Sequence, residues 1–138
     1  MKIRDIINGE KPTLSFEVFP PKKDTDFANV EAAAFGIAGL SPSYMSVTYG
    51  AGGSTKGHTI ALAQAIQEKY NVPTIAHLTC VCANREGIKA ALSELKSAGI
   101  ENILALRGDI PKNYEGEVFT DFSHASELVK LITVSYTH

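Results

Sequence analysis

A strand pattern followed by a helix pattern repeats four times along this chain, and this repeat limits its possible folds more than any other feature. Strand starts recur about every 30 residues, which is the length of one βα unit. The strand-like segments are residues 13–19, 44–49, 74–80 and 102–106. Apolar residues at helical spacing follow each of them. The first three predicted helices cover residues 24–38, 56–70 and 84–99, and a fourth begins after a cap at Asp121 or Ser123. Strands that alternate with helices form parallel sheets with right-handed crossovers, so the sequence predicts an α/β fold.

Two architectures fit this repeat: an open doubly wound sheet, or part of a closed (β/α)8 barrel. A complete barrel needs about 250 residues, and the 138 residues of this chain hold four βα units. Every predicted strand has one apolar face, formed in the last strand by Leu104 and Leu106, and one face that becomes polar toward its carboxyl end. A strand between two helical layers is apolar on both faces. We therefore expect residues 1–138 to be a single partial domain, half of a (β/α)8 TIM-type barrel.

Composition and charge favour a cytoplasmic protein. The formal net charge of −2 offers no basis for binding a polyanion such as nucleic acid. The first residues lack an apolar signal segment, and no apolar run approaches the roughly 20 residues that cross a bilayer. Cys80 and Cys82 are too few for a disulfide framework, and the histidines lack metal-site spacing. We expect no metal, no membrane and no nucleic-acid partner.

Glu17 is the first candidate for chemistry, because it lies between two apolar residues just before Pro20 and Pro21. Burial among apolar neighbours raises the pKa of a carboxyl group, which then acts as a general acid near neutral pH. A buried glutamate paired with a lysine or arginine is an equal alternative from position alone. The glycine-rich loop at residues 50–54 is either a tight turn or an anion cradle at a helix N-terminus.

Further candidates stand at the carboxyl ends of the other strands. Thr48 and His77 end the second and third strands, and Arg107-Gly108-Asp109 follows the fourth. Arginine offers a planar fork for phosphate, and glycine lets a flat ligand approach the backbone. The structural alternatives are a hydrogen-bonded core histidine and an Arg–Asp pair that closes a turn. Polar residues from four strands at one rim nevertheless indicate a common site.

Four motifs, in this order, resemble the methylenetetrahydrofolate reductase family: SFEVFPPK at residues 15–22, SVTYGAGGST at 46–55, AHLTC at 76–80 and NILALRGD at 102–109. The resemblance implies a (β/α)8 barrel that binds FAD at its carboxyl rim. It implies hydride transfer from NADH or NADPH through FAD to 5,10-methylenetetrahydrofolate, which makes 5-methyltetrahydrofolate for methionine biosynthesis.

The resemblance also implies roles for individual residues. Glu17 matches the general acid that protonates folate N10, and Asp109 matches the aspartate near the flavin and pterin. The positions that match FAD contacts are Thr48, His77, Arg107, Gly108, Asp109 and Ala125. Ala125 follows His124, where the family commonly has a tyrosine.

The end of the chain departs from the family. Residues 133–138 do not resemble the expected continuation, and we expect an aberrant tail after a truncation or frameshift. Four units leave the first and fourth strands as unpaired edges, so we expect this chain alone to be inactive and to depend on a second half-barrel. Two alternatives stay open: a non-catalytic half-barrel that is a binding or assembly module, for example as a homo-oligomer, and a complete doubly wound domain.

Overall fold

The four strands form one parallel sheet in the sequential order β1-β2-β3-β4. The computed structural model describes residues 1–50 and 54–136. The strands are β1 (Ser15–Val18), β2 (Tyr44–Val47), β3 (Thr74–Thr79) and β4 (Asn102–Leu106). The helices are α1 (Ile3–Ile7), the 3-10 turn η1 (Asp24–Asp26), α2 (Phe27–Ala38), α3 (Lys56–Tyr70), α4 (Arg85–Ser97) and α5 (Ala125–Tyr136).

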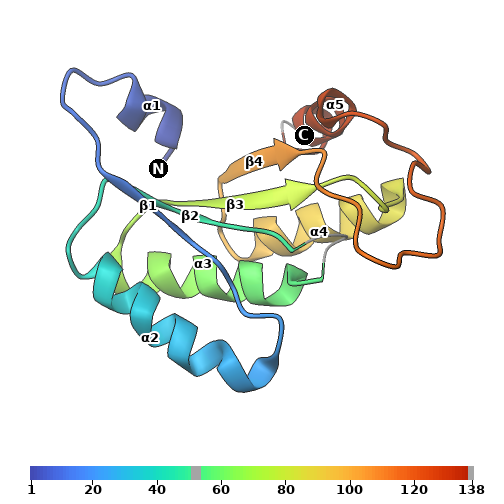
Figure 1. The fold of residues 1–138 in the computed structure, drawn as a ribbon. Helices are drawn as coiled ribbons and strands as arrows, with labels where there is room; N and C mark the ends of the chain where they lie inside the picture. Colours follow the sequence, from blue (N-terminus) through green and yellow to red (C-terminus); the bar gives the residue numbers. More distant parts are fainter. Residues whose placement is uncertain (51–53, 137–138) are drawn as a thin grey trace.

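Helices α2, α3 and α4 lie on one side of the sheet, and α5 lies beside β4 (Figure 1). A doubly wound fold has strand-order reversals and helices on both faces. The sequential order and the single helical layer are instead those of consecutive βα units in a barrel wall. The predicted half of a (β/α)8 barrel is therefore confirmed, and the doubly wound alternative is wrong.

Local signals in the sequence explain most helix boundaries. The Asn84 side chain accepts a hydrogen bond from the backbone N–H of Gly87 at 2.8 Å, so it caps α4 as the sequence predicts. Helix α3 ends at Tyr70, and its C-cap residue Asn71 has a left-handed φ of 53°. The start of α5 differs from the expectation: the Glu127 carboxylate accepts the N–H groups of Ser123 and His124.

The core lies between the sheet and the helices and is built from alternate strand residues. Its fully buried apolar members from the strands are Met45, Val47, Ala76 and Leu78, together with Cys80 just past the end of β3. The helices contribute Ala34, Ala38, Leu62, Ala63, Ile66, Ile88, Ala91, Leu92, Leu95, Leu128 and Leu131. Because one face of each strand supplies this core, the other face carries the polar positions of the sequence pattern.

Strand β4 reverses the predicted assignment of its faces. Its register pairs Leu78 with Ala105 and His77 with Leu104. Ala105 therefore packs against the core with Ile103, while Leu104 lies on the helix-free face and is 42% exposed. The predicted apolar face of Leu104 and Leu106 is thus the one away from the helices, because residue type alone does not fix which face of a strand packs against the core.

The short helix α1, which the sequence pattern does not predict, lies at the amino ends of the strands (Figure 1). Ile3 is buried, and its backbone N–H donates to the Asn102 side chain at 2.9 Å. The segment between β4 and α5 lies at the opposite, carboxyl end of the sheet (Figure 1). In barrels of this type the carboxyl end carries the functional residues and the amino end contributes stability.

Candidate functional site

Three polar side chains from neighbouring strands meet on the helix-free face of the sheet. Glu17 of β1 pairs in register with Ser46 of β2, and His77 comes from β3. The Ser46 hydroxyl lies 2.7 Å from Nε2 of His77 and 3.4 Å from Oε2 of Glu17. The same Oε2 and Nε2 atoms are 3.5 Å apart. The structure thus brings Glu17 and His77 together, and Ser46 lies between them.

Burial differs sharply across this cluster. The side chain of His77 is 9% exposed and that of Glu17 is 48% exposed. Burial lowers the pKa of His77, and the nearby Glu17 carboxylate opposes this effect by raising it. The neutral imidazole is therefore favoured. The apolar surroundings expected for Glu17 do not form, because Phe16 and Val18 point to the opposite face.

Thr48 lies two residues beyond Ser46, just past the end of β2. Its backbone N–H donates to the carbonyl of Val18 at 3.0 Å, and its carbonyl accepts the Thr59 hydroxyl at 2.8 Å. These bonds fix the end of β2 against β1 and α3. The next residue, Tyr49, is half-buried, and burial, with a smaller effect of the Glu94 charge, raises the pKa of its hydroxyl to about 12.

The turn after β4 packs tightly against the end of β3. The carbonyl of Arg107 accepts the backbone N–H groups of Cys80 and Val81. Gly108 has a φ of +85°, and a Cβ at this position would lie 2.7 Å from Cβ of Thr79. The backbone conformation and the packing against Thr79 therefore already require glycine at this position.

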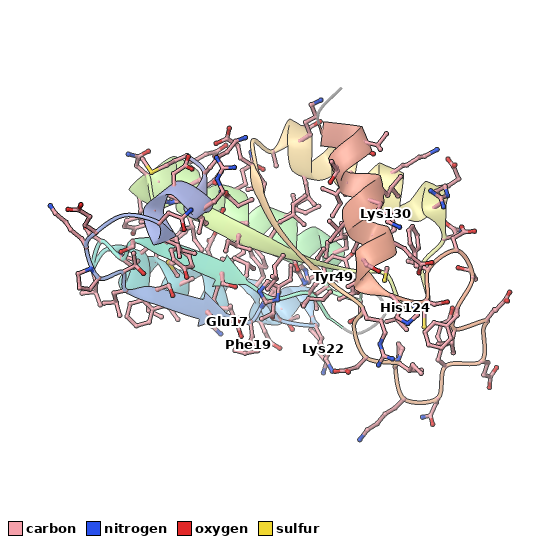
Figure 2. All side chains as sticks on the ribbon, turned by 90° about the horizontal axis from the view of Figure 1, so that it is seen from above. Glu17, Phe19, Lys22, Tyr49, His124 and Lys130 are labelled. Atoms are coloured by element: carbon pink, nitrogen blue, oxygen red, sulfur yellow. The ribbon has the colours of Figure 1, made fainter. Side chains whose placement is uncertain are left out.

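Arg107 and Asp109 are exposed, and within residues 1–50 and 54–136 neither side chain forms an ion pair or hydrogen bond with the other or with Glu17. The turn-closing Arg–Asp pair is therefore not formed. In Figure 2, Glu17 and Phe19 lie near β1, and His124, just before α5, lies well away from them. Ala125 is the first residue of α5 and is half-buried.

Ser46 is a site residue that the sequence motifs did not single out. It stands on the polar face of β2, one strand from Glu17, so alternation and strand order together are the signal that would have found it. The predicted loop at residues 50–54 falls largely on residues 51–53, which lie outside the described residues. No group of three or more metal-ligating side chains occurs in the described part of the chain.

A flavin fits the residues at this end of the sheet in one specific respect. The hydroxyl of Thr79 is buried and lacks a hydrogen-bond partner among the described residues. Buried hydroxyl groups normally have partners. Thr79 also lines a cleft of about 220 Å³ with Tyr49, Lys56, Val81, Ala83, Gly87 and Ile88. An unused donor and acceptor beside Gly108 suits a ligand rich in carbonyl and ring nitrogen atoms.

Comparison with known proteins agrees with this geometry. The family model described as methylenetetrahydrofolate reductase matches residues 2–138. "Methylenetetrahydrofolate reductase 2" of Schizosaccharomyces pombe is 40% identical over 144 residues, 99% of this chain and 22% of the yeast protein. "Methylenetetrahydrofolate reductase (NADH) 1" of Arabidopsis thaliana is 36% identical over 137 residues, 98% of this chain and 23% of the plant protein.

A bacterial relative covers a larger share of its own length. "5,10-Methylenetetrahydrofolate reductase" of Pectobacterium carotovorum is 32% identical over 119 residues, 86% of this chain and 39% of the bacterial protein. The chain thus spans between about a fifth and two fifths of the curated relatives that it matches. Its parallel βα units and its match over residues 2–138 show that the chain belongs to the methylenetetrahydrofolate reductase family.

Proposed function

We propose that this chain supplies the first four βα units of a flavin-dependent methylenetetrahydrofolate reductase. The complete enzyme would reduce 5,10-methylenetetrahydrofolate to 5-methyltetrahydrofolate with NADH or NADPH. The observation that carries the proposal is the Glu17 carboxylate on the helix-free face, next to Ser46 and His77, in a chain of this family. Because the chain spans only 22% to 39% of these relatives, the activity belongs to the complete reductase.

FAD, when bound, supplies the hydride transfer between the nicotinamide and the folate. In this proposal Glu17 holds the proton that folate N10 receives, and its half-exposed position leaves it accessible to substrate. The Asp109 carboxylate stabilises positive charge that develops on the pterin. The residues that bind the cofactor are Thr48, His77, Arg107, Gly108, Asp109 and Ala125. The hydroxyl of Thr79, which lacks a partner among the described residues, offers one further hydrogen bond.

Titration of FAD with the purified 138-residue chain tests cofactor binding by this half of the barrel. We expect the chain to quench flavin fluorescence, and Arg107→Ala to weaken binding by about tenfold, because the guanidinium is an exposed cation at the carboxyl rim. Arg4→Ala is the matched control, since Arg4 lies on α1 at the other end of the sheet. A folded chain that leaves flavin fluorescence unchanged would show that these residues do not hold the cofactor by themselves.

A second function, a non-catalytic binding or assembly module, is favoured by one observation. Strands β1 and β4 are the two edges of the described sheet, and Phe19 is 67% exposed beside Glu17. Edge strands and exposed apolar residues promote association. A colourless, stable homodimer that does not bind FAD would support this function over the reductase.

A further inference from the structure

The atoms that join Glu17, Ser46 and His77 form a small triangle. The Ser46 hydroxyl is 2.7 Å from Nε2 of His77, a short hydrogen bond, and 3.4 Å from the Glu17 carboxylate, a longer and weaker contact. Nε2 and Oε2 are separated by 3.5 Å. Ser46 is therefore the one member of the three that contacts both of the others at a shorter distance than they contact each other.

The chemistry of the three groups sets the direction of these bonds. An ionised carboxylate is only an acceptor, so the Ser46 hydroxyl donates to Glu17. The Ser46 oxygen then accepts a hydrogen bond, and the atom that faces it is Nε2 of His77. The arrangement that satisfies all three groups has the proton of a neutral His77 ring on Nε2. A chain of donors then runs from the His77 ring through Ser46 to Glu17.

We propose that Ser46 is a positioning residue that links the His77 ring to the Glu17 carboxylate and transfers the proton that reprotonates Glu17. The catalytic consequence rests on the function proposed above, whereas the linkage itself is a property of this chain. The geometry on which it stands is the register of three adjacent strands, which holds all three side chains on one face.

The proton count of the relay balances within the three groups and one water molecule. After Glu17 has given up its proton, the Ser46 hydroxyl transfers a proton to the carboxylate and receives one from Nε2 of His77. The Nδ1 atom of the same ring takes a proton from a water molecule, which leaves as hydroxide, so the ring remains neutral and has changed its tautomer. Return of the ring to the Nε2–H tautomer by exchange with water resets the relay.

The surroundings of the ring restrict which groups control it. On the other side of His77 the register places Leu104 of β4, which carries no charge. Glu17 is the charged side chain that acts on the His77 ring. Burial of the ring favours the neutral form of His77. Arg107 and Asp109, which follow β4, form no ion pair with the ring in the described part of the chain. A change of the His77 tautomer therefore reports on Glu17 and Ser46.

Nitrogen-15 NMR of the His77 ring in the FAD-free chain tests this linkage. We expect the Nε2–H tautomer to dominate while Glu17 is ionised. Ser46→Ala is expected to lower the ratio of Nε2–H to Nδ1–H by about fivefold, the equivalent of one hydrogen bond. Ser46→Thr restores the hydroxyl and is expected to restore the ratio.

Ser15→Ala is the matched control, because Ser15 lies on the same face of β1 without a described contact to the cluster. A wild-type ring that is mainly Nδ1–H would overturn the proposal whether or not the variants fold. A ratio that is unchanged in folded Ser46→Ala would overturn it as well. Because no flavin is present, failure of the relay and failure of cofactor binding are separate results.

Discussion

The histidines show how the same side chain acquires opposite properties from its surroundings. Nδ1 of His58 lies 2.7 Å from the carbonyl of Pro21, and its Nε2 lies 2.7 Å from the carboxylate of Asp24. Both neighbours are acceptors, so the charged ring, with two N–H donors, satisfies both. The hydrogen bond to Asp24 is the main reason that the pKa of His58 is raised, whereas burial lowers that of His77.

The raised pKa of His58 gives its contribution to stability a definite sign. The contribution is full below the unfolded pKa of 6.5 and is lost as pH rises through the higher folded pKa. We expect His58→Asn to lower the free energy of unfolding by about 0.5–1 kcal/mol at pH 5.5 and by less at pH 8.5. Urea denaturation at the two pH values measures this difference, with the exposed His124→Asn as the control. An equal loss at both values would contradict it.

His77 is expected to behave in the opposite way. Because the pKa of His77 is lower in the folded chain, the unfolded chain takes up the proton at a higher pH. The contribution of His77 to stability is therefore fully present above pH 6.5 and is lost as pH falls through the folded pKa. Replacement by Gln removes this dependence. In urea denaturation at pH 5 and pH 7.5, we expect a smaller difference for His77→Gln than for the wild type. An unchanged difference would show that another group causes the acid sensitivity.

Gly108 is a position where the backbone and the packing both demand glycine. Its φ of +85° is unfavourable for other residues, and a Cβ would contact Thr79. We expect Gly108→Ala to lower the free energy of unfolding by about 1–3 kcal/mol. Gly57→Ala in α3 is the control, since a Cβ added there would have no neighbouring atom within 4 Å; it should stabilise by about 0.5–1 kcal/mol. Thermal unfolding that ranks the two variants in the reverse order would contradict this explanation.

At the scale of elements, two hydrogen bonds connect the segment before α5 to the start of α4. The Asp121 carboxylate accepts the backbone N–H of Arg85 at 2.6 Å, and the Thr120 hydroxyl donates to the carbonyl of Ala83. The sequence pattern offers Asp121 as a cap for α5, but in the structure this residue caps α4. Tertiary contact therefore decided which of two nearby helix starts receives this carboxylate.

Removal of this cap tests the connection between the two elements. We expect Asp121→Ala to lower the free energy of unfolding by about 1 kcal/mol, as loss of a helix cap usually does. Hydrogen exchange should also become faster at the first amides of α4. The exposed Glu115→Ala, in the same segment, serves as the control. Unaltered exchange at Arg85 would mean that the carboxylate contributes nothing to the helix start.

At the scale of the whole molecule, the helix-free face combines the polar cluster with exposed apolar residues. Leu104 beside His77 is 42% exposed, and the inner positions of a closed barrel are normally filled by such side chains. Strands β1 and β4 each have one neighbour in the described sheet. In a closed barrel, further βα units would cover this face.

Self-association of the 138-residue chain is the expected result of leaving this face uncovered. We expect Leu104→Lys to lower the apparent mass in light scattering at high protein concentration, because a charge on an inner edge position opposes pairing. Val129→Lys, exposed on α5, is the comparison for added charge alone. Equal effects of both substitutions would show that net charge, rather than this face, controls association.

The amino-acid sequence by itself determined the alternation of strands and helices and most of their limits. The predicted ranges for α3 and β4 match the structure, and Asn84 caps α4 as expected, because periodicity and caps are properties of neighbouring residues. The tertiary structure decided which face Leu104 occupies, where Asp121 binds, and that Ser46 joins Glu17 to His77. These outcomes depend on strand register and on contacts between residues far apart in the chain, which no local pattern encodes.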